Sequence, residues 1–316
     1  MRGVRGVQVD HHPFERAAGP ERHSFHPELP KPSRPDGGRT GRPDGRWGIA
    51  AGWPRLATPE TVIGTAARTV GQIRVSGSAF SVRFGFSVRF GSEGRSMKIG
   101  IIGAGNIGGN LTRRLSALGH EVSVANSRGP ETLAALAEET GATAVHVTEA
   151  ARGAQVVVVT IPLKAIPDLP SGLFDEAAEG FAVIDTGNYY PQQRDGRIAA
   201  IEDDGLTESR WTERHLGHPV IKAFNGTYAQ DILDRPRPAG DPDRIALPVA
   251  GDDEAAKKTV RALIDELGFD TVDAGSLDDS WRQQPDTPVY GLRAGIDAVE
   301  RALADASPER PETFRA

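Results

Sequence analysis

The chain has 316 residues, a formal net charge of −6 at pH 7 and 38% hydrophobic residues, which allows one large domain or two small ones. It contains no cysteine, which excludes disulfides, thiolate catalysis and cysteine-bound metals. Its longest apolar run, residues 156–159, is too short to cross a membrane and is typical of a buried parallel strand. We expect a cytoplasmic protein that does not bind membranes.

The charge is unevenly distributed, and residues 1–96 differ in kind from the rest. They hold 15 Lys and Arg and 8 Asp and Glu, whereas the rest of the chain holds 22 Lys and Arg and 35 Asp and Glu. The segment is rich in Arg, Gly and Pro, repeats the hexapeptide FSVRFG at 80–85 and 86–91, and has no sustained helical or strand period. A basic tail that binds nucleic acid is one interpretation. The composition favours a disordered, dispensable extension instead, with Met97 as the expected natural start.

From residue 97 to 316 strand and helix patterns alternate, which predicts an α/β domain. Its expected architecture is a doubly wound parallel sheet with helices on both faces and a small C-terminal α/β extension. The expected strands are residues 98–102, 121–125, 143–147, 155–160, 181–185, 219–224, 244–250 and 269–273. The expected helices are residues 106–118, 131–140, 254–267 and 292–306, and residues 189–217 are expected to be loosely structured.

The first strand leads into a glycine-rich turn that is typical of a dinucleotide site. The spacing Gly103-x-Gly105-x-x-Gly108 permits a tight turn, close approach of the backbone to a pyrophosphate, and close packing of the next helix on the strand. The N-terminus of that helix offers free N–H groups and a positive dipole end to the phosphates. The predicted phosphate-binding residues are Gly103, Ala104, Gly105, Asn106, Ile107 and Gly108.

About 20 residues further on, where this fold normally has an acid for the adenosine ribose, the chain has Asn126, Ser127 and Arg128. A hydroxyl and a guanidinium suit a 2′-phosphate, which a carboxylate would repel. The sequence therefore predicts an NADP(H) site.

Further candidate residues follow other strands, because ligands of a doubly wound sheet lie beyond the carboxyl ends of its strands. Thr160, Ile161 and Pro162 are expected at the nicotinamide end, since the strand order reverses between strands one and four. Asn188 is a candidate ligand contact. No catalytic residue is assigned: Asp185 is a candidate acid, although an acid there more often makes a turn hydrogen bond, and Lys222 is a candidate proton donor or an exposed charge. His215 and His218 lack further ligands at a metal-binding spacing.

Five motifs together resemble the coenzyme F420-dependent NADP oxidoreductase family: GAGNIG (103–108), NSR (126–128), TIP (160–162), VIKAFN (220–225) and VAGDD (249–253). The resemblance covers about residues 97–290. It implies hydride exchange between the nicotinamide C4 of NADP(H) and C5 of a deazaflavin, coenzyme F420, which would be the co-substrate. Carried over by position, it implies an NADP site of Ala104, Gly105, Asn106, Ile107, Ser127, Arg128, Ile161, Pro162 and Ala223.

The chain departs from that family pattern at two places. Deazaflavin reductases of the family carry a Lys just after the Ser-Arg pair, where this chain reads Gly129-Pro130-Glu131, and His-Thr where it reads Asn225-Gly226-Thr227. The prediction of an NADP(H) site still stands, because Ser127 and Arg128 are present. The departures leave open whether the second small-molecule substrate is a deazaflavin or a similar planar acceptor.

Two other readings stay open, and a homodimer is expected. One is an NADP-dependent dehydrogenase or imine reductase of the 6-phosphogluconate type, which the short stretch after Val289 disfavours because those relatives add a long helical domain. The other is an NADPH-sensing protein without turnover.

The expected homodimer depends on the aromatic segment 281–290 and the last helix, which offer a surface that a second subunit could cover. Alternatively, the polar segment 278–284 could cover the pocket of the same subunit.

Overall fold

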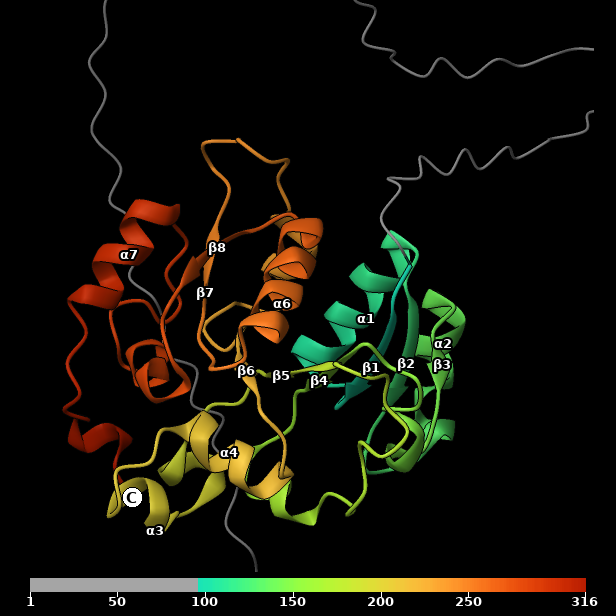
Figure 1. Ribbon diagram of the computed structural model, residues 1–316, viewed down its shortest axis with the longest axis horizontal. Coiled ribbons are helices and arrows are strands. Elements are labelled where there is room, and N and C mark those ends of the chain that lie inside the picture. Colours follow the sequence, from blue (N-terminus) through green and yellow to red (C-terminus); the bar gives the residue numbers. More distant parts are fainter. Residues whose placement is uncertain (1–95) are drawn as a thin grey trace, which may run out of the picture. The chain divides into compact units, whose positions relative to one another are not determined.

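A six-stranded parallel sheet forms the centre of the computed structural model, which describes residues 96–316 (Figure 1). The strand order is β3-β2-β1-β4-β5-β6, so the predicted doubly wound topology, with its reversal between β1 and β4, is confirmed. The predicted extension at residues 1–96 lies outside the described residues, apart from Ser96. The strands are β1 (Lys98–Ile102), β2 (Glu121–Ala125), β3 (Thr143–Ala144), β4 (Val156–Val159), β5 (Ala182–Asp185) and β6 (Ile221–Lys222).

The unbroken valine run of β4 is explained by burial on both faces of the sheet. Val156 and Val158 pack in one cluster with residues of α1 (Asn106–Leu118) and α6 (Glu254–Leu267). Val157 and Val159 pack in another, which contains Trp211 of α4 (Glu208–Leu216). Because successive side chains of a strand point to opposite faces, a strand covered on both sides needs apolar residues throughout.

A second, two-stranded parallel sheet follows the first. It consists of β7 (Ala246–Val249) and β8 (Asp270–Asp273), joined by α6 and packed against α7 (Ile296–Ala304). Two backbone hydrogen bonds join Lys222 of β6 to Ala250 in an antiparallel bridge, at N···O distances of 2.8 and 3.1 Å. These bonds attach the end of the large sheet to the small one, and the ribbons labelled β6 and β7 lie near each other in Figure 1.

The predicted bounds of β1, β2, α1 and α6 are confirmed to the residue, whereas the other predicted strands and the last helix were too long. The third strand ends at Ala144 rather than residue 147, because a capping box between His146 and Glu149 starts a 3₁₀ turn there. The last helix begins at Ile296 rather than residue 292, because Ala294 stays outside it and accepts a hydrogen bond from the Ala246 N–H of β7.

The stretch 189–217 was predicted to be loose, and this was wrong. It contains α3 (Ala199–Glu202) and the longer α4, whose N-terminus is capped by Thr207. The buried face of α4 includes Glu208, Ser209 and Thr212, so no apolar period revealed it. The remaining short helices are α2 (Ala134–Thr140), which follows a 3₁₀ turn at Pro130–Leu133, and α5 (Asp231–Asp234).

Candidate functional site

The glycine-rich turn lies between β1 and α1 and has the conformation that a dinucleotide needs. Gly103 has φ of 109°, which favours glycine, and its N–H donates to the Ala125 carbonyl oxygen at 2.8 Å. A Cβ at Gly108 would lie 1.9 Å from the Gly103 oxygen and 2.7 Å from Thr160 Cγ2. Only glycine therefore lets α1 pack this closely on the strand ends.

Gly105 differs from the other two glycines because a Cβ there would meet no atom within 4 Å. It is exposed at the N-cap of α1, which has neither a side-chain cap nor an acid in its first turn. The first N–H groups of this 13-residue helix therefore have no side-chain acceptor. Bare backbone, free N–H groups and the positive helix end together fit a pyrophosphate.

Asn126 holds the turn after β2 that would meet the adenosine ribose. Its Oδ1 accepts a hydrogen bond from the Arg128 N–H at 2.9 Å, and its amide donates to Thr132 Oγ1 at 2.9 Å. Ser127 and Arg128 are exposed, and within the described residues the guanidinium of Arg128 forms no ion pair. The turn therefore presents a hydroxyl and an uncompensated positive charge to solvent, as a phosphate site requires.

The other predicted residues lie on the same edge of the sheet. Thr160, Ile161 and Pro162 are half-buried directly after β4, and Ile161 packs against the Gly103 turn. Ala223 follows β6 and is fully buried, and its N–H donates to the Asp185 carbonyl oxygen at 3.2 Å. Phe224 has φ of 63°, an uncommon conformation for a bulky residue, which bends the chain away from the sheet at this edge.

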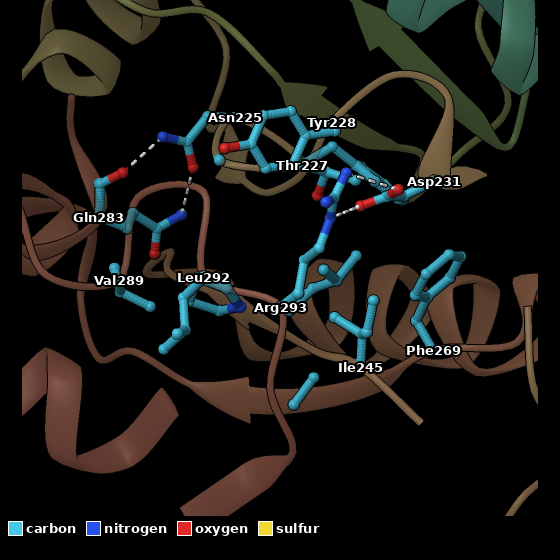
Figure 2. A pocket seen from close by; sticks show the side chains of 15 residues that line it. Asn225, Thr227, Tyr228, Asp231, Ile245, Phe269, Gln283, Val289, Leu292 and Arg293 are labelled. Carbon is cyan, nitrogen blue, oxygen red and sulfur yellow. Dashed lines mark hydrogen bonds and ion pairs between the residues drawn. The ribbon is translucent and has the colours of Figure 1, made fainter. Parts of the chain in front are cut away.

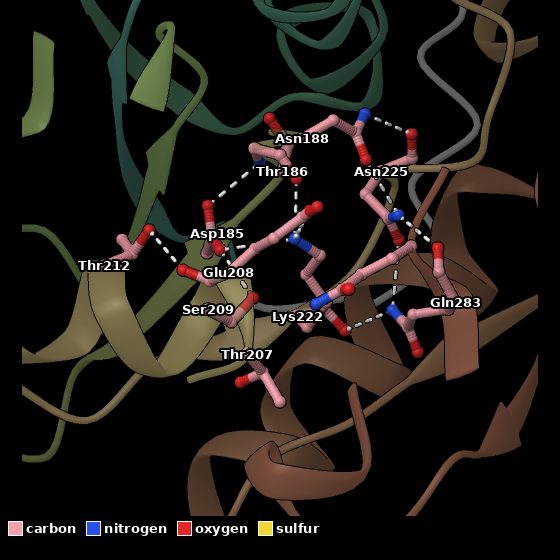
Figure 3. A network of polar contacts seen from close by, with 12 residues as sticks. Asp185, Thr186, Asn188, Thr207, Glu208, Ser209, Thr212, Lys222, Asn225 and Gln283 are labelled. Atoms are coloured by element: carbon pink, nitrogen blue, oxygen red, sulfur yellow. Dashed lines mark hydrogen bonds and ion pairs between the residues drawn. The ribbon is translucent and has the colours of Figure 1, made fainter. Parts of the chain in front are cut away.

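A buried ionic cluster lies under the ends of β5 and β6, and Figure 3 shows how its side chains converge. The Lys222 ammonium lies 3.5 Å from Asp185 Oδ2 and 3.7 Å from Glu208 Oε2, and all three side chains are at most 1% exposed. Asp185 also accepts hydrogen bonds from the Gly187 N–H at 2.8 Å and the Ser209 hydroxyl at 2.6 Å. The cluster fixes the turn after β5, and it contains both Asp185 and Lys222 of the sequence analysis.

Glu208 receives a second cation from the C-terminal segment. Arg310 donates a hydrogen bond to Glu208 Oε1 at 2.5 Å and another to Gln284 Oε1 at 2.9 Å. Burial raises the pKa of the Glu208 carboxyl, while Lys222 and Arg310 oppose this effect. Two buried carboxylates are thus balanced by the buried Lys222 and the partly exposed Arg310, and removal of either cation leaves buried negative charge less compensated.

An amide network continues from this cluster to the sheet edge. Asn225 donates to Asn188 Oδ1 at 3.1 Å and to the Gln283 carbonyl oxygen, and the Asn188 amide donates to the Asn225 carbonyl at 2.8 Å. The Gln283 amide donates to Asn225 Oδ1 at 3.1 Å and to the Lys222 carbonyl at 3.3 Å. Asn188 is half-buried at the edge, so the network connects a surface amide to the buried ions.

A pocket opens beside Asn225, between the β6–α5 loop and β7 (Figure 2). Its walls combine apolar side chains such as Val289 and Leu292 with the Arg293 guanidinium, which pairs with Asp231 at 2.6 and 3.0 Å. The side-chain oxygen of Gln283 has no hydrogen-bond partner among the described residues.

Glu208, Gln284 and Arg310 were missed by sequence reasoning. Thr207 followed by an acid in the first turn is a helix-start signal that could have located α4 and Glu208. No local pattern links Arg310 to them. His215 and His218 are not brought together at a site: His215 packs on Trp211, and His218 packs on Phe181. Among residues 96–316 no group of three metal-binding side chains is found, and no helix is long and apolar enough to span a membrane.

The doubly wound sheet, the glycine turn and the Ser-Arg turn at one edge place this domain in the class of dinucleotide-binding α/β proteins. Residues 98–189 match the family described as NADP oxidoreductase, coenzyme F420-dependent. The match agrees with the predicted resemblance to an NADP oxidoreductase family over these residues, which are less than a third of the chain.

Similar proteins include two solved structures. A hypothetical protein, SMa0349 from Sinorhizobium meliloti, is 29% identical with a TM-score of 0.52, and the match covers 65% of this chain and 98% of that one. A putative F420-dependent NADP reductase from an Arthrobacter species is 25% identical with a TM-score of 0.49, over 58% of this chain and 86% of that one.

Among curated proteins, the Escherichia coli putative protein YjhV is 49% identical over 53 residues, which is 17% of this chain. The matches span only 31% to 39% of the length of the curated relatives.

Proposed function

We propose that this protein is an NADPH-binding oxidoreductase that moves a hydride between NADP(H) and a deazaflavin, such as coenzyme F420, or a similar planar acceptor. The observation that carries the proposal is the open phosphate turn at Gly105, with the exposed Ser127 and Arg128 on the same edge of the sheet. The family match over residues 98–189 supports both the nucleotide and the kind of acceptor.

The chain's own residues would bind and orient the two reactants. The N-terminus of α1 would hold the pyrophosphate, Ser127 and Arg128 the 2′-phosphate, and residues 160–162 the region of the nicotinamide. When bound, NADPH supplies the hydride, and the acceptor takes it up together with a proton from solvent. Because such a transfer depends mainly on proximity and alignment, the site needs no acid–base pair among its residues.

The test follows NADPH oxidation optically against deazaflavin, flavin and quinone acceptors, with Arg128→Ala as the matched variant. Oxidation that requires the deazaflavin, and that is weakened in the variant at limiting NADPH, is the expected result. Turnover with an imine or a small carbonyl compound alone would favour the dehydrogenase reading. NADPH binding without turnover by any acceptor would indicate a sensor instead.

We also expect a homodimer. Tyr228 and Ile296 are the exposed large apolar side chains among the described residues, with 52% and 42% of their surface exposed. Ile296 begins α7, so this helix is a candidate surface for a second subunit. Sedimentation that shows only monomer at micromolar concentration would contradict the expectation.

A further inference from the structure

The turn that would meet the adenosine ribose also contains a carboxylate. The side chain of Glu131 folds back over Gly129, so that a Cβ placed on Gly129 would lie 2.5 and 2.6 Å from its two carboxylate oxygens. Gly129 has φ of 97°, which directs the chain from Arg128 back toward Glu131. Ser127, Arg128 and Glu131 therefore belong to one turn after β2.

This turn is held in place by its own hydrogen bonds. Asn126 Oδ1 accepts from the Arg128 N–H, while Thr132 Oγ1 donates to the Gly129 carbonyl at 2.8 Å. The two bonds fix both ends of the segment between Arg128 and Thr132. The carboxylate of Glu131, folded over Gly129, therefore lies in the same short turn as Arg128, whose guanidinium the phosphate would meet.

No ion pair of 4.0 Å or less involves Arg128 or Glu131 within residues 96–316, and both residues are exposed. A bound 2′-phosphate would therefore meet one guanidinium that attracts it and one carboxylate that repels it. The NADH ribose carries hydroxyl groups there, which a carboxylate accepts as hydrogen-bond partners. The carboxylate would thus weaken the binding of NADPH and favour the binding of NADH.

We propose that Glu131 is a specificity-determining residue, which opposes the 2′-phosphate and narrows the preference for NADPH over NADH. The inference rests on the proposed function, because it assumes a nicotinamide dinucleotide on this turn. The opposing charges are solvent-exposed, so their interaction is modest and screened by salt. Removal of the charge should tighten NADPH binding by about three- to tenfold.

The experiment compares Glu131→Gln with the wild-type protein in titrations with NADPH and NADH. Glutamine keeps the size of the side chain and removes only its charge. Glu138→Gln is the matched control, because Glu138 is an exposed acid of α2 outside this turn. We expect Glu131→Gln to lower the Kd for NADPH and to leave that for NADH unchanged or raised, with a smaller difference at about 0.5 M salt. The control should match the wild-type protein.

Three outcomes would overturn the inference. The first is an unchanged ratio of the two Kd values in Glu131→Gln, including equal tightening of both cofactors, and it leaves the proposed function standing. An equal effect of Glu138→Gln would show that only net charge matters. A wild-type protein that binds neither cofactor would overturn the proposed function together with the inference. Thermal melting of each variant confirms that the exposed substitution leaves the fold intact.

Discussion

The ammonium group of Lys222 donates a hydrogen bond to the backbone carbonyl oxygen of Gly187 at 2.6 Å. Gly187 follows β5 and Lys222 ends β6, so a single buried side chain connects the ends of two neighbouring strands. Asn188, the next residue, reaches the edge where the nicotinamide is expected. The sequence offered Lys222 as a candidate proton donor or an exposed charge; it is neither exposed nor open to a substrate, and its position indicates a structural role.

Lys222→Met should therefore destabilise the protein strongly. The substitution leaves Asp185 and Glu208 buried with one fewer cation, and breaking a buried pair in this way costs about 3–5 kcal/mol. Chemical denaturation measures the loss. Lys258→Met on the exposed side of α6 is the matched control and should change the free energy of unfolding by less than about 0.5 kcal/mol. Similar stabilities of the two variants would contradict the role of the cluster.

Arg128→Ala should remove the preference for NADPH. Charge-assisted hydrogen bonds contribute about 1.5–3 kcal/mol each, so loss of the guanidinium should weaken NADPH binding by about one to two orders of magnitude. NADH lacks the 2′-phosphate and should be little affected, and Ser127→Ala should have a smaller effect. Titration calorimetry with both cofactors measures this. Equal losses for NADPH and NADH would mean that the turn does not contact the phosphate.

Two glycines of the phosphate turn should respond differently to alanine. A Cβ at Gly108 would collide with the Gly103 carbonyl and Thr160, so Gly108→Ala should cost about 1–3 kcal/mol or more in stability. Gly105→Ala meets no protein atom and should fold normally, yet lose nucleotide affinity because the methyl group occupies the space for the pyrophosphate. Melting temperatures paired with NADPH titrations separate the two effects. A Gly105→Ala variant with full affinity would argue against a nucleotide at this turn.

Glu208 should make stability depend on pH. Its pKa is raised above the ordinary value by burial, so at pH values between the ordinary and the raised pKa the native state binds more protons than the unfolded state. The free energy of unfolding should therefore fall as pH rises through this interval. Glu208→Gln removes the titrating group and should flatten this part of the curve, whereas Glu138→Gln should not. Denaturant unfolding across mildly acidic to neutral pH tests this; parallel curves for wild type and Glu208→Gln would refute it.

Most of the large sheet could be predicted from sequence, because the buried positions of β1, β4 and α1 are apolar residues or glycines at a regular spacing. The prediction was wrong for residues 189–217, since α4 buries Glu208, Ser209 and Thr212 against charged and hydroxyl partners rather than an apolar layer. A sequence period cannot distinguish such a face from a solvated one. The two-residue strands β3 and β6 were likewise overestimated, because turns and tertiary bonds end them early.

The candidate nucleotide site was predicted at the level of motifs, since each lies within a few residues of a strand end. The buried cluster was not, because it joins Asp185, Glu208 and Arg310, which are distant in sequence and meet only after folding. The position of Glu131 over Gly129 also needed coordinates. The chain turns at Gly129 with a positive φ, and the folding of the Glu131 side chain over this glycine could not be inferred from its charge alone.

The bridge between Lys222 and Ala250 has a consequence for assembly. It occupies the backbone groups of Lys222 on the outer side of β6, and the opposite edge strand, β3, is only two residues long. Neither edge of the six-stranded sheet thus offers a run of free N–H and C=O groups for strand addition across subunits. Within residues 96–316, a dimer would therefore not be built by adding a long strand of one copy to the central sheet of the other.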